Sequence, residues 1–97
     1  MIKAMRLISV RPDMDETNRY YLTYSYQEKE DAQALTDRME DDGPAAHVEL
    51  FGFERHLMII SDGDELRQVK AVTYTIEISD GNSDLNDAAS FARLIIE

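Results

Sequence analysis

The segment Leu66–Ile78, LRQVKAVTYTIEI, constrains the fold more than any other part of the sequence. From Ala71 onward, apolar and polar positions alternate with a period of two, and β-branched and aromatic side chains dominate. This pattern predicts a β-strand with one buried face. The buried face would consist of Val72, Tyr74, Ile76 and Ile78, and the other face of Ala71, Thr73, Thr75 and Glu77.

The first part of this segment is out of phase with the second, because Val69 lies on the same side as Ala71. We therefore expect a bulge or twist near Val69–Lys70. The Asp62-Gly63 dipeptide predicts a hairpin turn to the apolar run Leu57–Ile60, a buried strand in its own right. An earlier strand, Ala46–Phe53, would form a second hairpin through Glu54–His56, with a bulge at Gly52.

The N-terminal half predicts two more strands and a helix. Ile2–Arg11 has apolar residues on both faces, which favours a central strand, and Arg19–Gln27 would pair with it as a hairpin. Glu28–Asp42 has helical periodicity with Ala32, Leu35 and Met39 on its inner side, and Gly43-Pro44 ends it. A final helix begins after a cap at Ser83 or Asp84 and has a stripe that includes Leu85, Ala88, Ala92 and Ile95.

The predicted fold class is therefore α+β, with the order β-β-α-β-β-β-α in one domain over residues 1–97. An antiparallel sheet of about five strands would have two helices packed on one face, as a two-layer sandwich.

The amino-acid composition limits the classes of partner that the chain can bind. The chain has no cysteine, and its 20 acidic against 10 basic residues give a formal net charge of −10. Direct binding to nucleic acid or to an anionic membrane is disfavoured, since both need clustered Lys and Arg. A protein partner with a basic surface remains permitted. No stretch resembles a signal peptide or a membrane span, so we expect a cytoplasmic protein.

The candidate metal, catalytic and phosphate-binding sites do not match the sequence motifs that such sites require. Asp80–Asp84 begins like a calcium loop, but Leu85 and Phe91 replace the required glycine and glutamate, and a helix-capping turn explains the run. His47, Glu49 and His56 lack the spacing of known zinc motifs. Nucleophile elbows and phosphate-binding loops are absent from the sequence. We therefore expect no enzyme activity, no cofactor and no metal.

Four tyrosines lie close together in Arg19–Gln27. Tyrosine is enriched at protein interfaces, so Tyr21, on the opposite face from its neighbours, is a candidate partner-binding residue. The other three share a face with Leu22, which favours the core over an interface for them. They are Tyr20, Tyr24 and Tyr26.

The acidic helix carries the most specific hypothesis. If its apolar side faces inward, four carboxylates lie on or near the outer side and span about 16 Å at about 1.5 Å per residue. Such a row would imitate a few backbone phosphates and occupy a basic cleft, making the chain a DNA mimic. The candidate residues are Glu30, Asp37, Glu40 and Asp41.

We therefore expect a non-enzymatic acidic protein-binding module, in its most concrete form an inhibitor of a nucleic-acid-binding protein. Phage counter-defence and anti-CRISPR proteins are an analogy of size and charge, without a shared motif. One alternative is a self-assembling structural or accessory protein that forms a homodimer through a sheet edge or the tyrosine face. A small ligand-binding domain or enzyme is a third reading, and a solvated helix face would explain the same acidic residues.

Overall fold

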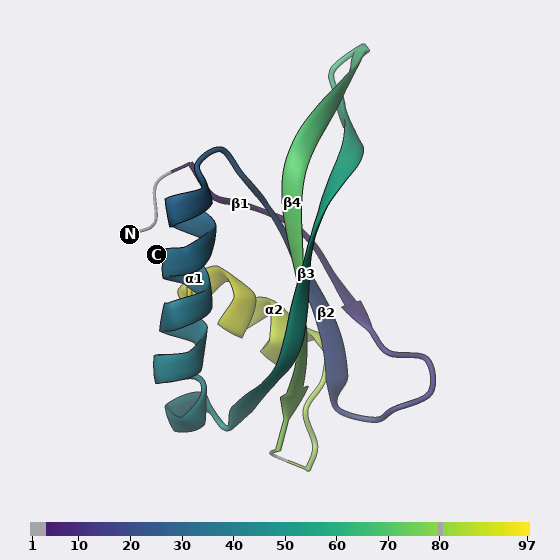
Figure 1. Cartoon of the computed structure of the whole chain (residues 1–97). Coiled ribbons are helices and arrows are strands. Elements are labelled where there is room, and N and C mark those ends of the chain that lie inside the picture. The colour runs from purple at the N-terminus through teal and green to yellow at the C-terminus, as the bar shows by residue number, and fades with distance from the viewer. Residues whose placement is uncertain (1–3, 80) are drawn as a thin grey trace.

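A computed structural model describes residues 4–79 and 81–97 of the chain. Its elements, in chain order, are β1 (Arg6–Pro12), β2 (Arg19–Tyr26), α1 (Lys29–Asp42), a short 3₁₀ helix η1 (Pro44–Ala46), β3 (Val48–Asp62), β4 (Glu65–Ile78) and α2 (Leu85–Leu94). The strands form one antiparallel sheet in the order β1-β2-β4-β3, and both helices lie on one face of it (Figure 1). The predicted α+β class and the helices on one face are confirmed.

The sheet has four strands where the sequence predicted about five. Residues 46–53 and 57–60 do not form a hairpin, because β3 continues from Val48 to Asp62 without a turn. Ala46 belongs to η1 and His47 follows it, so the strand begins two residues later than predicted. Glu54, Arg55 and His56 pair regularly with Thr73, Val72 and Ala71. This tripeptide has no glycine, proline or asparagine to support a tight turn. The predicted bulge at Gly52 is present, as a register shift between Leu50 and Gly52.

Strand β1 lies at an edge of the sheet, so the central position expected for Ile2–Arg11 is wrong. Ile2 and Lys3 lie outside the described residues. A register shift between Leu7 and Ser9 places Leu7 and Val10 opposite Tyr24 and Leu22. The bulge, and not burial on two sides, therefore explains why apolar residues occur at both odd and even positions of this strand. The predicted β1–β2 hairpin is confirmed.

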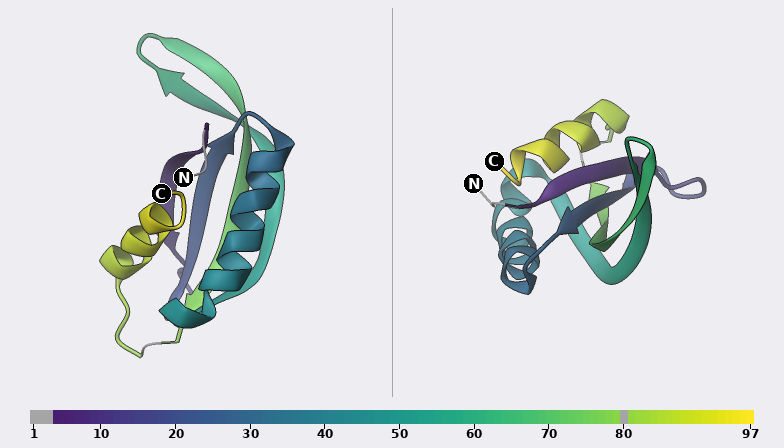
Figure 2. Two further views of the ribbon diagram at one scale, coloured as in Figure 1. Left: turned by 90° about the vertical axis from the view of Figure 1, so that its left-hand side faces the viewer. Right: turned by 90° about the horizontal axis from the view of Figure 1, so that it is seen from above.

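Strand β4 is central and holds the sheet together. Its pairing with β3 is regular from Asp62–Glu65 to Phe53–Tyr74. Of the bulge or twist expected near Val69–Lys70, the bulge is therefore absent. Pairing with β2 ends at Tyr26–Lys70, and beyond that point β3 and β4 continue as a two-stranded hairpin (Figures 1 and 2). At its tip, Gly63 has φ +66°. A positive φ at the first loop residue alone is typical of a type II′ turn.

The core lies between the sheet and the helices. The alternation in β4 is confirmed, since Val72, Tyr74, Ile76 and Ile78 are all buried. Opposite them, Ala32, Leu35 and Met39 of α1 are buried as expected. Helix α2 contributes Ala88, Phe91, Ala92 and Ile95, whereas Leu85 of its predicted stripe is exposed. The rings of Tyr24 and Tyr74 meet edge to face, with centroids 5.9 Å apart.

The helix ends follow their local chemistry. Asp84 caps α2 in a capping box with Asp87, as one of the two predicted caps. Gly43 ends α1 but not in the left-handed conformation that such a glycine usually adopts, since its φ is −56°. Instead, a Cβ atom here would lie 2.5 Å from the Met39 carbonyl oxygen and 2.8 Å from that of Val48. Close approach of two backbone segments therefore requires glycine.

Candidate partner-binding surface

Helix α1 exposes one continuous side because its buried residues all lie on the other. Ala32, Leu35, Thr36 and Met39 face the sheet. The hydroxyl of Thr36 bonds the Ala32 carbonyl oxygen at 3.0 Å and the Tyr74 hydroxyl at 2.7 Å. These apolar and polar contacts fix the rotation of the helix about its axis.

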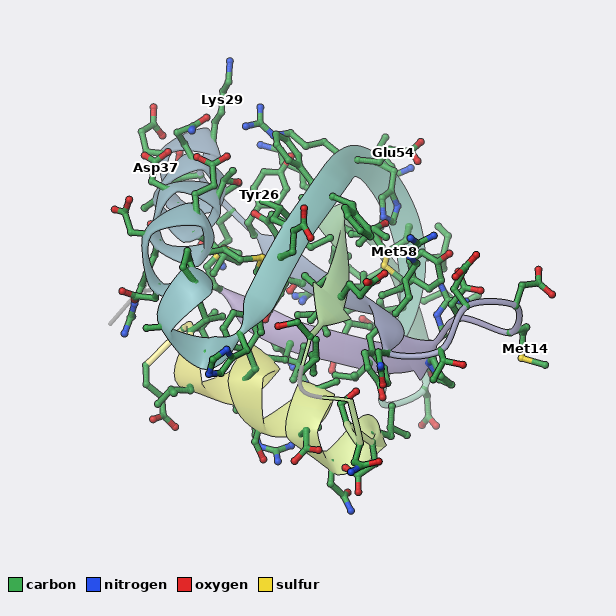
Figure 3. All side chains as sticks on the ribbon, turned by 90° about the horizontal axis from the view of Figure 1, so that it is seen from below. Met14, Tyr26, Lys29, Asp37, Glu54 and Met58 are labelled. Carbon is green, nitrogen blue, oxygen red and sulfur yellow. The ribbon has the colours of Figure 1, made fainter. Side chains whose placement is uncertain are left out.

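Three of the four predicted carboxylates form a row on the outward side. At about 100° per residue, Glu30, Asp37 and Asp41 lie nearly opposite the buried stripe, whereas Glu40 lies about a quarter turn from it. All four side chains are exposed. Figure 3 shows Asp37 on the outer side of the molecule, away from Glu54 and Met58 on the far side. We call Glu30, Asp37 and Asp41 the acidic row.

No carboxylate of the acidic row forms an ion pair with another described residue. The three ion pairs among the described residues join Arg19 to Glu77, Arg38 to Asp42, and Arg67 to Asp62. Within the row, Asp37 accepts a hydrogen bond from the Gln33 amide at 3.0 Å. The carboxylates therefore keep most of their charge available to a partner.

The C-terminal turn of α1 is acidic, contrary to what a helix favours. Glu40, Asp41 and Asp42 lie where the helix dipole is negative, and the last turn contains no basic residue. Arg38 offsets part of this charge, since it pairs with Asp42 at 3.3 Å and donates to the Glu97 carbonyl oxygen. Carboxylates in this turn therefore cost stability.

Tyr21 lies on the other face of the sheet, which the helices leave uncovered. Its hydroxyl donates to the Asp13 carboxylate at 2.5 Å. This bond lowers the pKa of Asp13, with help from the backbone amides of Asp15 and Glu16, and raises the pKa of Tyr21. Tyr21 and the acidic row are thus on opposite sides of the molecule, and one flat partner surface cannot contact both.

The uncovered face contains a shallow hollow of about 550 Å³. The Arg19 guanidinium lies 4.6 Å from the centre of the Phe51 ring and 3.3 Å from the Glu77 carboxylate. Thr73 bonds both Thr23 and His56, at 2.8 and 2.9 Å. Most polar groups here are thus satisfied by one another. The lining residues are Arg19, Tyr21, Phe51, Gly52, Phe53, Glu54, Thr73 and Thr75.

The even-numbered tyrosines belong to the core, as the pattern favoured. Tyr20 and Tyr24 are buried and Tyr26 packs against them half-buried. The Tyr24 hydroxyl donates to the Ala92 carbonyl oxygen at 2.8 Å, which ties β2 to α2. Burial raises the pKa values of Tyr24 and Tyr74. The helices therefore cover this tyrosine face.

The other candidate residues are not brought together. His47 follows η1 in a left-handed conformation, with φ 59°, and His56 lies in the middle of β3. Within residues 4–79 and 81–97, no three His, Asp or Glu side chains cluster as metal ligands. Asp80, the first residue of the calcium-like run, lies outside the described residues. No helix in the described part of the chain is long and apolar enough to cross a membrane.

No family model matches the chain, and no curated protein or solved structure matches it significantly.

Proposed function

We propose that the chain is a non-enzymatic, cytoplasmic protein-binding module whose helix α1 binds a basic surface of another protein. In its most concrete form the partner is a nucleic-acid-binding protein, and the chain inhibits it by occupying the cleft for the nucleic acid. Phage counter-defence and anti-CRISPR proteins are the analogy, on size and charge alone.

One observation carries this proposal: the acidic row is exposed, aligned and without ion pairs among the described residues. Because α1 is rotationally fixed by its buried contacts, the row is held rigidly. A helix held in place loses little backbone freedom on binding, which favours affinity.

The dimensions of the row also suit a nucleic-acid cleft. Glu30 and Asp41 are separated by about 16 Å along the helix axis, at about 1.5 Å per residue. One strand of duplex DNA places about five phosphates over that length, at about 3.4 Å each. A cleft with Arg and Lys spaced for phosphates would therefore find three carboxylates within the same length.

The test compares two variants with the same net charge. The row variant carries Glu30→Gln, Asp37→Asn and Asp41→Asn. The control carries Asp15→Asn, Glu16→Gln and Glu54→Gln, three exposed acids outside α1 and outside the β3–β4 turn. Each is immobilised and used to capture proteins from a lysate of the native host, and captured proteins are then challenged with duplex DNA.

We expect the wild type and the control to capture the same basic protein, the row variant to lose it, and duplex DNA to displace it. If the row and control variants lose the partner equally, net charge rather than the row is responsible. Equal capture by all three variants, or a partner that DNA does not displace, would contradict the proposal.

A further inference from the structure

The β3–β4 hairpin projects from the body of the protein. We call residues 57–70 the arm, since pairing with β2 ends at Lys70, the partner of Leu57. Its six cross-strand pairs extend for about 20 Å at about 3.4 Å per residue. Figures 1 and 2 show the arm rising clear of both helices and of the rest of the sheet.

The arm is apolar on the face that continues the helix-covered side of the sheet. Leu57, Ile59 and Leu66 share this face and are 62%, 59% and 78% exposed. Phe53, 45% exposed, continues the strip toward the core, where its ring meets Tyr74. A strip of large apolar side chains on a thin projecting ribbon is costly to leave in water, so it indicates an interaction surface.

The charges of the arm are segregated along its length. Asp64 lies in the turn at the tip, and at the root Lys70 lies on the apolar-strip face, with Arg55 on the same face just outside the arm. Asp62 and Glu65 lie on the reverse face. Arg67 is engaged by Asp62 at 3.8 Å. From Arg55 to Lys70 the three acidic and three basic side chains cancel, so this segment is neutral within a chain of net charge −10.

We propose that two copies of the chain associate through their arms, laid antiparallel and face to face across a two-fold axis. The apolar strips meet in the middle, and Asp64 at the tip of each arm lies over Lys70 and Arg55 at the root of the other. This inference is independent of the proposed function of α1.

A second copy fits this surface because the arm is self-complementary. The arm carries Asp64 at its tip, an apolar middle and Lys70 and Arg55 at its root. Turned end for end, it presents the charge pattern that the first arm requires, as an isologous interface demands. Neutrality of the segment also lets two acidic chains approach there. At physiological ionic strength, repulsion between the acidic bodies is screened beyond about 8 Å.

The contact area sets the strength of the association. The arm face measures about 20 by 10 Å, from the strand rise and the spacing of two strands. That is well below the roughly 800 Å² per partner of a standard interface. The dimer is therefore weak, and its population depends on protein concentration.

The first experiment measures molar mass by sedimentation equilibrium over a wide range of protein concentration. We expect the wild type to pass from monomer to dimer. A strip variant, Leu57→Thr with Ile59→Thr, keeps β-forming residues and should raise the dissociation constant at least about tenfold, because it removes buried apolar surface. The control, Met14→Thr with Leu94→Thr, removes two exposed apolar side chains outside the arm and should dimerise like the wild type.

The second experiment tests the antiparallel arrangement with two charge reversals, Lys70→Glu at the root and Asp64→Lys at the tip. Each variant alone puts like charges together at both ends of the dimer and should dimerise more weakly. A mixture of the two restores opposite charges at both ends, so a mixed dimer should form. The variant that carries both reversals should also dimerise like the wild type.

A wild-type chain that stays monomeric over the whole range would overturn the proposal. A dimer that the strip variant leaves intact would place the interface elsewhere, and a mixture no heavier than its separate components would exclude the antiparallel arrangement. The row variant of α1 should dimerise normally, so this test and that of the proposed function fail separately.

Discussion

At the scale of single residues, Gly43 is the position where the backbone tolerates least change. Gly43→Ala places a methyl group against two backbone carbonyl oxygens, at 2.5 and 2.8 Å, and neither can move without shifting α1 or β3. We expect a loss of about 1–3 kcal/mol in the free energy of unfolding, as for other overpacked sites. Gly52→Ala is the control, because a Cβ there has no neighbour within 4 Å. Urea unfolding would contradict the explanation if both variants lost the same stability.

The buried tyrosines predict a loss of stability at alkaline pH. Burial raises the pKa of Tyr24 in the folded chain above its ordinary value of 10.0. Below pH 10 the proton is bound in both states; above it, the unfolded chain releases the proton first. Stability therefore falls as pH rises, by about 1.4 kcal/mol per pH unit for each such group.

Tyr24→Phe tests this linkage. At neutral pH the variant should lose about 1 kcal/mol, because the Ala92 carbonyl oxygen loses its bond from the hydroxyl. Above pH 10 its stability should fall less steeply than that of the wild type, since one titrating group is gone. An unchanged slope in urea unfolding across that pH range would show that Tyr24 is not responsible.

At the scale of elements, the two ends of α1 have opposite electrostatics. Glu30 lies in the first turn, where the helix dipole favours negative charge, and Asp41 lies in the last, where it does not. Glu30→Gln should therefore destabilise the protein and Asp41→Asn stabilise it, each by about 0.3–1 kcal/mol at low salt. Thermal unfolding measures both changes.

These two variants also separate folding from binding. If the acidic row binds a partner through its charge, both should weaken capture of that partner, although their stabilities move in opposite directions. If the Asp41 variant captured the partner normally and only the Glu30 variant captured less, capture would depend on stability. That result would contradict a role of the acidic row in binding.

Elements whose pattern lies within their own residues were predicted more closely than elements that depend on pairing with a distant strand. Helix α1 and the buried face of β4 were predicted closely, because periodicity over many residues determines each of them. Strand β3 was divided in two because its apolar run Leu57–Ile60 follows three charged or polar residues, and only pairing with β4 shows that no turn occurs there. The edge position of β1 was missed for a similar reason, since a bulge imitates burial on both faces.

The candidate surfaces were predicted in part. The outward position of the acidic row follows from helical geometry alone, whereas the separation of Tyr21 from it depends on which face of the sheet the helices cover. The arm was missed, although Leu57–Ile60 and Leu66 carried its signal. They were assigned to a buried strand because no local pattern tells how far a hairpin extends beyond its sheet.

At the scale of the whole molecule, the net charge of −10 predicts how stability responds to salt. Only three ion pairs join the described residues, so most carboxylates repel one another in the folded chain. Salt screens that repulsion, with a Debye length that falls from about 30 Å at 0.01 M to about 3 Å at 1 M. Raising sodium chloride over this range should therefore raise the unfolding temperature, on the order of 5 °C for about 1 kcal/mol.

The row variant provides the control, because it removes three of the repelling charges. Its unfolding temperature should start higher at low salt and rise less. Binding of a basic partner should respond in the opposite direction and weaken as salt rises, since screening acts on attraction between the two surfaces. Stability and affinity measured in the same salt series must therefore diverge if the acidic surface is a cost to folding that is retained for binding. A parallel decline of both would mean that salt acts on the fold, and that α1 has no separate electrostatic role.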